Sequence, residues 1–391
     1  MDRDFQARQI SKAGAKGAEI DELLAYNENH FDLGALGPDT VFPLPDEPFV
    51  ECWQTWAEEA EGEGAFPVLR RYLPQFAFPI VEGVSQWPSY RKATLQGADP
   101  SALDEATGLV VEDPSAIRLE LYSSLAGRVP VLALRGRSAF VAMVRALGKR
   151  NEPVEIPDSM GALMIAGFNN WHRIHGLRTR FLATPEDERE HPSWREAFAA
   201  IRPQKALYQD RFMLLSDGPY SAVPAGDLGL SEADWREKSL IIRRDHECAH
   251  YFTRRLFGSM RNNLHDELIA DYAGIVAAEG CYRADWFLRF VGLESFPDYR
   301  PGGRLDLYRG DPALSDGAFR ALHVLVVRAA EHLERFDHAE LGDDRTPHRQ
   351  ALALATLAGL RLDELASPEG AELLSRSLAD LEARMARPAI G

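Results

Sequence analysis

Two histidines and a glutamate stand at helical spacing past the middle of the chain. The segment His246-Glu247-Cys248-Ala249-His250 is an H-E-x-x-H sequence. Residues i and i+4 leave the same face of a helix, so both imidazoles can converge on one metal ion. Glu247 projects about 100° further round the helix, where it can hold a water beside that ion and take its proton. The spacing therefore predicts a metal centre that activates water.

A pair of carboxylates follows the two histidines. Sixteen residues separate His250 from Glu267, which leaves room for a turn at residues 258–263 and an antiparallel return. Glu267 can then complete a site of two histidines and one glutamate, with the fourth position left for water or substrate. Asp271, one turn further on, can accept the outer N–H of a ligand histidine. Asp266 is the alternative ligand if the second helix is rotated.

Two helices must position these side chains, and the sequence predicts both. The first is expected over residues 231–257, where Ser231 is the candidate N-cap and acidic residues fill the first turn. Its histidine face is otherwise largely apolar, so the imidazoles are expected to be buried and to need polar partners. The second helix is expected over residues 265–279. Cys248 faces away from the two histidines and is expected to pack as a small apolar side chain.

The remaining elements divide into a small sheet and a helical half. Apolar and alternating runs predict strands at residues 117–122, 129–134, 162–166 and 211–216. Further helices are expected at residues 18–26, 51–61, 67–72, 139–147, 192–201, 283–291, 316–336, 348–360 and 368–386. This order predicts an α+β fold with a small mixed sheet. We expect residues 1–114, rich in proline and aromatic side chains, to form a cap. Residues 115–391 would form the metal-binding catalytic domain, with its sheet in 115–230 and its helices in 231–391.

Composition limits the classes of function. The 391 residues include 44 Lys and Arg against 60 Asp and Glu, a formal net charge of −16. Binding to nucleic acid or to an anionic membrane surface needs clustered positive charge, so we expect neither. The three cysteines lie far apart, and no apolar run reaches the roughly 18 residues that span a membrane. A cytoplasmic protein without a leader segment is therefore expected, and its oligomeric state stays open.

Residues 245–273 resemble the gluzincin zinc metallopeptidases, in which an H-E-x-x-H helix is followed by a helix bearing Glu-x-x-x-Asp. The resemblance implies a zincin-like fold in which His246, His250 and Glu267 hold Zn²⁺. It further implies Glu247 as general base and Asp271 as hydrogen-bond partner of a ligand histidine. The Gly-x-Met-Glu-Asn motif of the related aminopeptidases is absent from the sequence.

A hydrolase of this kind also needs a hydrogen-bond donor for the oxyanion that forms on its substrate. Four residues are candidates for this role: His323, His332, Tyr308 and Tyr220. Thermolysin-like enzymes use a histidine well after the ligand glutamate, so the resemblance favours His332 or His323 as a catalytic residue. Four arginines flank the motif, and one of them could clamp a substrate carboxylate: Arg243, Arg244, Arg254 and Arg255. His172 and His175, three residues apart, are candidates for lining a pocket.

Three functions remain open at this point. The first is a zinc-dependent hydrolase of a peptide or small-molecule amide, in which Glu247 takes a proton from water and returns it to the leaving nitrogen. The second is another metal reaction in small-molecule biosynthesis, because two histidines and a carboxylate also hold non-haem iron. The third is a non-catalytic protein whose aromatic N-terminal region binds a partner. We expect the first.

Overall fold

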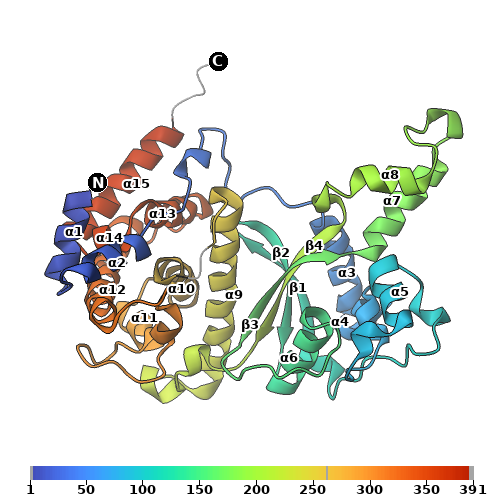
Figure 1. Cartoon of the computed structure of the whole chain (residues 1–391), viewed down its shortest axis with the longest axis horizontal. Coiled ribbons are helices and arrows are strands. Elements are labelled where there is room, and N and C mark those ends of the chain that lie inside the picture. The colour runs from blue at the N-terminus through green and yellow to red at the C-terminus, as the bar shows by residue number, and fades with distance from the viewer. Residues whose placement is uncertain (1–2, 261–262, 387–391) are drawn as a thin grey trace. The chain divides into compact units, whose positions relative to one another are not determined.

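The computed structural model describes residues 3–260 and 263–386 (Figure 1). These residues form fifteen α-helices and a four-stranded sheet, which confirms the α+β class. Arg261 and Asn262, in the expected turn between the two site helices, lie outside the described residues. None of the described helices combines the length and the apolar character that a membrane crossing requires.

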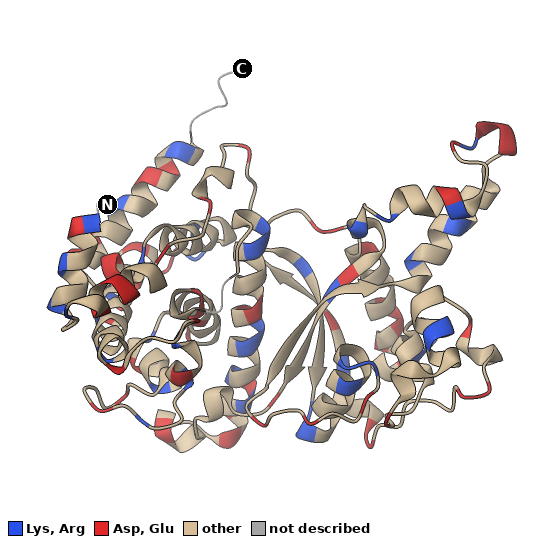
Figure 2. Ribbon diagram, viewed as in Figure 1, with Lys and Arg blue, Asp and Glu red and all other residues tan. Residues whose placement is uncertain are grey.

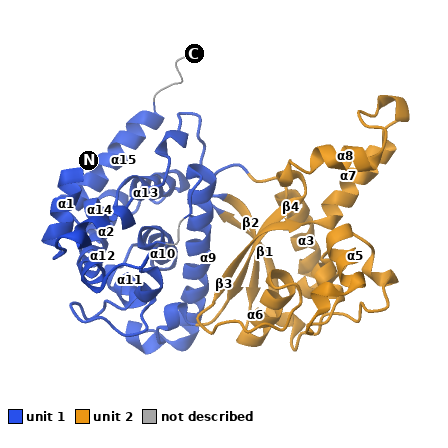
Figure 3. Ribbon diagram, viewed as in Figure 1, with its two compact units in different colours: residues 1–45, 124–126, 219–391 blue, residues 46–123, 127–218 orange. Residues whose placement is uncertain are grey.

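The chain forms two compact units, and both are discontinuous in sequence (Figure 3). Unit 1 consists of residues 1–45, 124–126 and 219–391, and unit 2 consists of residues 46–123 and 127–218. The first 45 residues thus belong with the C-terminal helices, and the rest of the expected cap belongs with the sheet. Acidic and basic residues are interspersed in both units (Figure 2).

Unit 1 is helical. Its α-helices are α1 (Arg3–Lys12), α2 (Ala18–Tyr26), α9 (Glu232–Phe257), α10 (Leu264–Glu279), α11 (Ala284–Val291), α12 (Asp316–Phe336), α13 (Pro347–Gly359), α14 (Leu362–Leu365) and α15 (Gly370–Met385). The caps of the two site helices explain where they begin. The Ser231 hydroxyl accepts the backbone N–H of Asp234, and the Asn263 side chain accepts that of Asp266. Both long helices of the motif therefore begin within one residue of their expected positions.

Unit 2 contains the sheet and the remaining helices. Its elements are α3 (Val50–Glu63), α4 (Ala65–Tyr72), α5 (Pro88–Gln96), α6 (Arg137–Met143), α7 (Trp171–Ala183), α8 (Trp194–Ile201), β1 (Ile117–Ser124), β2 (Gly127–Leu134), β3 (Ala162–Asn169) and β4 (Gln209–Ser216). The strand order is β1-β2-β4-β3, with β4 parallel to β2 and antiparallel to β3. The sheet is therefore mixed, as expected. Helix α7 was not expected, because Ile174 is its only buried residue and its sequence lacks an apolar face.

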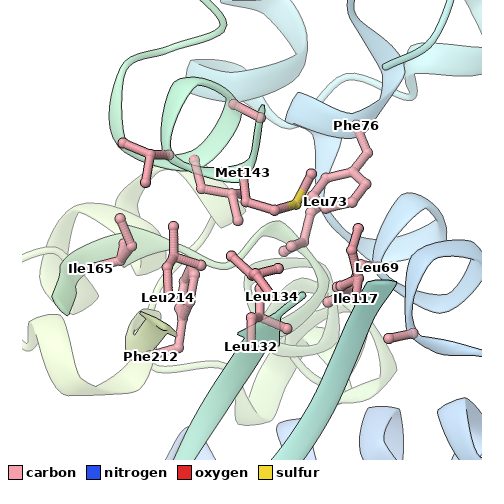
Figure 4. Close-up of a cluster of buried hydrophobic side chains, with 14 of the residues drawn as sticks. Leu69, Leu73, Phe76, Ile117, Leu132, Leu134, Met143, Ile165, Phe212 and Leu214 are labelled. Carbon is pink, nitrogen blue, oxygen red and sulfur yellow. The ribbon is translucent and has the colours of Figure 1, made fainter. Parts of the chain in front are cut away.

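The core of unit 2 lies where α4 and α6 cover the sheet. Leu132 and Leu134 of β2 and Phe212 and Leu214 of β4 are almost fully buried. Figure 4 shows their side chains among those of Ile117, Leu69, Leu73, Phe76, Met143 and Ile165. The two central strands have buried residues on both faces, which explains why their sequences read as continuous apolar runs.

The two site helices pack against each other as an antiparallel pair with an unusually close approach. A Cβ atom at Gly274 of α10 would lie 2.5 Å from the carbonyl oxygen of Ile242 in α9, so only glycine fits here. Along this seam successive turns of α9 meet successive turns of α10, in the pairs Ile242–Gly274, His246–Asp271 and His250–Glu267. The glycine therefore sets the spacing at which the side chains of the motif meet.

Gly274→Ala should force α9 and α10 apart. We expect it to cost about 1–3 kcal/mol of unfolding free energy, as overpacked substitutions usually do, and to weaken metal binding because the ligands move with their helices. Gly176→Ala in α7 is the matched control, since a Cβ there would meet nothing within 4 Å. It should be neutral or stabilising by about 0.5–1 kcal/mol. Urea denaturation and chelator competition measure both effects, and indistinguishable variants would contradict the role given to Gly274.

Candidate metal centre

The side chains of His246, His250 and Glu267 converge at the seam between α9 and α10. The two histidine Nε2 atoms are 3.1 Å apart. Glu267 places Oε2 3.6 Å from Nε2 of His246 and Oε1 3.4 Å from Nε2 of His250. All three side chains are buried, and together they form a group that could hold a metal ion. A tetrahedral ion with bonds of about 2.0–2.1 Å has ligand atoms roughly 3.3 Å apart, so these separations fit one.

Asp271 orients one of the two histidines. Its Oδ1 atom lies 2.8 Å from Nδ1 of His246, and its side chain is fully buried. Because a carboxylate accepts a hydrogen bond, Nδ1 of His246 carries the proton. The lone pair of the ring is then on Nε2, the atom that faces His250 and Glu267.

Tyr220 and Arg304 surround the Asp271 carboxylate. The Tyr220 hydroxyl donates to Oδ1 of Asp271 at 2.6 Å, and an Arg304 N–H donates to Oδ2. Arg304 also donates to the Tyr220 hydroxyl at 2.8 Å and lies 3.9 Å from Oε2 of Glu267. A single guanidinium thus lies beside both buried carboxylates. The Tyr220 proton is committed to Asp271, so Tyr220 is not available as the donor to an oxyanion.

The charges of this cluster keep both carboxylates ionised. Burial acts to raise the pKa of Glu267, but the hydrogen bond with His250 and the charges of the histidines and Arg304 hold it well below its usual range. Burial likewise acts to raise the pKa of Asp271, but the Arg304 charge together with the hydrogen bond and charge of His246 lowers it below its usual value. Burial acts to lower the pKa of His250, whereas the hydrogen bond and charge of Glu267 raise it to about 9 in the metal-free site. An ion that binds here must therefore displace a proton.

Glu247 lies on α9 next to the ligand pair and is half-buried. It makes no hydrogen bond or ion pair with another described residue. Its negative charge nevertheless reaches His250, whose pKa it helps to raise. The site thus has a carboxylate close to the ligands whose oxygens are not committed to a protein partner.

Neither histidine that was expected to stabilise an oxyanion makes a contact with the three ligands among the described residues. Nδ1 of His332 lies 2.8 Å from the carbonyl oxygen of Leu365, which it joins in a hydrogen bond between α12 and α14. His323 packs against Phe319 and Tyr299, with ring centroids 4.6 and 5.2 Å apart. Nε2 of His323 is buried and has no hydrogen-bond partner among the described residues. The expectation rests on the resemblance to thermolysin-like enzymes, which gives the order of such a histidine in the chain but does not fix the position of a distant helix.

Tyr308 is the candidate donor whose hydroxyl is coupled to a ligand by charge. It lies in the 3-10 turn Arg304–Tyr308, together with Arg304, and the charge of Glu267 acts on its side chain. Burial raises the pKa of Tyr308, the Arg304 charge opposes this, and the charge of Glu267 adds to the increase, so the hydroxyl keeps its proton. Asp266, the alternative ligand, is not part of the converging group.

Arg304 is the residue that sequence reasoning missed. It lies 33 residues beyond Asp271 in a loop between α11 and α12, where no helical or strand period applies. The arginines that flank the motif were considered instead, because they are close in sequence. His172 and His175 do line a cavity, as expected, but this cavity is in unit 2.

Arg304→Met should loosen the metal centre by leaving Asp271 without its cation. Removing a partner of this kind typically lowers metal affinity about 10–100-fold, and we expect a loss in that range by chelator competition. Tyr220→Phe, which keeps the charges and deletes one hydroxyl, should have a smaller effect. The control is Arg254→Met, an exposed arginine on α9. Unchanged affinity in a folded Arg304→Met protein would show that the guanidinium does not support the ligands.

A family model described as a family of unknown function (DUF7005) matches residues 8–369. No curated protein and no solved structure matches the chain. The matched segment includes the three converging ligands, Asp271, Arg304 and residues of both compact units. Because the match takes in well over half of the sequence, the protein belongs to the family of unknown function DUF7005.

Proposed function

We propose that this protein is a zinc-dependent hydrolase that cleaves a peptide or small amide bond. The observation that carries the proposal is the convergence of His246, His250 and Glu267 beside the uncommitted carboxylate of Glu247. An H-E-x-x-H helix packed antiparallel on a helix with Glu-x-x-x-Asp is also the arrangement expected of a gluzincin. We therefore propose a zincin-like active site in unit 1.

The donor set suits zinc. Two neutral imidazoles and one carboxylate are a common catalytic zinc set, and they leave one coordination position for water or substrate. His246 is held in the required tautomer by Asp271 at 2.8 Å. Zinc bound there would supply Lewis acidity, which brings the pKa of a water towards 7 and polarises a substrate carbonyl.

Glu247 is the residue we assign to proton transfer. Its carboxylate would take a proton from the attacking water and deliver that proton to the leaving nitrogen when the carbon–nitrogen bond breaks. A general base needs an oxygen that is free of competing protein partners, and Glu247 has no hydrogen bond or ion pair with another described residue.

Tyr308 is the residue we assign to the oxyanion. Its hydroxyl keeps its proton, and the charge of Glu267 acts on it. Arg304, on the same 3-10 turn, would keep that turn against the ligands through Asp271. A protonated donor aimed at the reacting centre stabilises the charge that develops on a carbonyl oxygen.

Metal analysis tests the ion. Protein purified without added metal should contain one zinc per chain, because the site binds with three buried ligands. His250→Ala and Glu267→Gln should each lose it, whereas His338→Ala, an exposed histidine of unit 1, should retain it. One iron per chain after anaerobic purification would favour the alternative of non-haem iron chemistry on the same ligands. Absence of any bound metal would contradict both.

Glu247→Gln separates chemistry from metal binding. The variant should keep its zinc and lose at least about 100-fold in kcat, because general-base catalysis contributes 10²–10⁴. Glu237→Gln, an exposed glutamate on the same helix, is the control and should be as active as the parent. The assay uses internally quenched fluorescent peptides and acyl anilides. A zinc-loaded parent that cleaves neither class of probe, or a Gln variant with full turnover, would contradict the proposal.

A further inference from the structure

Unit 2 contains a cavity of about 500 Å³ that takes no part in the metal centre. It lies where the end of α4 and the 3-10 turn Pro74–Ala77 meet α5, the 3-10 turn Pro100–Ala102 and the first turn of α7. Pockets of roughly 300–1,000 Å³ are the size that holds small organic ligands. The side chains that line the cavity indicate the chemistry of its ligand.

The charged side chains around the cavity differ in whether they have partners. Arg71 is paired with Glu59 at 2.7 Å and with Glu63 at 2.5 Å. Asp99 accepts the backbone N–H of Ser101 at 2.9 Å, as the cap of its own 3-10 turn. Arg70, in contrast, has no hydrogen bond or ion pair with any described residue. Arg70 is therefore a guanidinium in the cavity lining that no described residue holds by direct contact, and Asp99 is the acidic side chain of the same lining.

The first turn of α7 adds donors on the same wall. His172 and His175 both line the cavity. Burial lowers the pKa of His172, and the charge of His175 lowers it further. The Asn170 side chain caps the helix by accepting only the backbone N–H of Arg173. The backbone N–H groups of Trp171 and His172 precede that position and have no partner within the helix. The N-terminal end of a helix attracts anions because its free N–H groups and its dipole are both positive.

The remaining wall is apolar and firmly held. Leu73, Pro74 and Ala93 line it, together with the ring of Trp171. Trp171 is fixed by a hydrogen bond from its indole N–H to the carbonyl oxygen of Thr94, at 2.8 Å. It lies so close to Gly97 that a Cβ there would be 2.2 Å from the ring. The apolar part of a ligand would therefore pack on a pre-formed surface.

We propose that unit 2 binds a small organic anion, a phosphate ester or a carboxylate, in this cavity. Its charged group would lie between Arg70 and the N-terminus of α7, within reach of His172 and His175. Its apolar body would pack on Trp171 and Leu73. The inference is independent of the metal centre, because none of these residues belongs to unit 1.

Isothermal titration with four probes tests the site. Phenyl phosphate and phenylacetate carry both the charge and the ring, inorganic phosphate carries only the charge, and benzyl alcohol carries only the ring. We expect one of the two organic anions to bind at least 10-fold more tightly than either partial probe, and the tighter one identifies the anionic group. Binding should persist in the His250→Ala protein, which lacks a ligand of the metal centre.

Variants then locate the binding. Arg70→Ala should lower the affinity for the tighter anion at least 10-fold. Arg178→Ala, an exposed arginine on α7 that does not line the cavity, should leave it unchanged. Both arginines are exposed, so both variants should fold. The proposal is overturned if the two variants bind alike, if benzyl alcohol binds as tightly as the anions, or if neither organic anion binds.

Discussion

The metal centre depends on one buried carboxylate, that of Asp271. It accepts hydrogen bonds from His246, Tyr220 and Arg304, which come from three separate segments of unit 1. A charge buried without its partners costs several kcal/mol, so these segments are stable only when they are assembled together. The orientation of His246 is therefore a property of the whole assembly and not of α9 alone.

Helix geometry made the ligands predictable. His246 and His250 lie one turn apart on one face of α9, and Glu267 and Asp271 lie one turn apart on α10. The i, i+4 spacing within each helix and the short connection between the helices are enough to bring the four side chains together. The N-caps Ser231 and Asn263 fixed where those two helices begin. The apolar runs of β2 and β4 likewise marked strands that are buried on both faces.

Features that depend on distant contacts were not predictable. Arg304 has no periodic relation to the motif, and its role arises only when its loop meets Asp271. His323 and His332 have the right residue type and chain order, but their contacts are with other residues: His323 packs on Phe319 and Tyr299, and His332 bonds Leu365 of α14. Helix α7 was missed because a single buried isoleucine leaves no apolar stripe in its sequence. Residues 1–45 group with the C-terminal helices through long-range packing, which local sequence patterns do not predict.

The discontinuity of unit 1 determines when its parts can come together during translation. Helix α2 makes its contacts with segments made much later: the Tyr26 hydroxyl donates to the carbonyl oxygen of Tyr308, and Asn29, just beyond α2, donates to that of Ala358. All of unit 2 is synthesised before the motif helix, and domains generally fold as units in the order in which they emerge. Helix α2 therefore lacks these partners while more than half of the chain is synthesised. The metal ligands are made only after all four strands, so the ion can bind only after unit 2 has been synthesised.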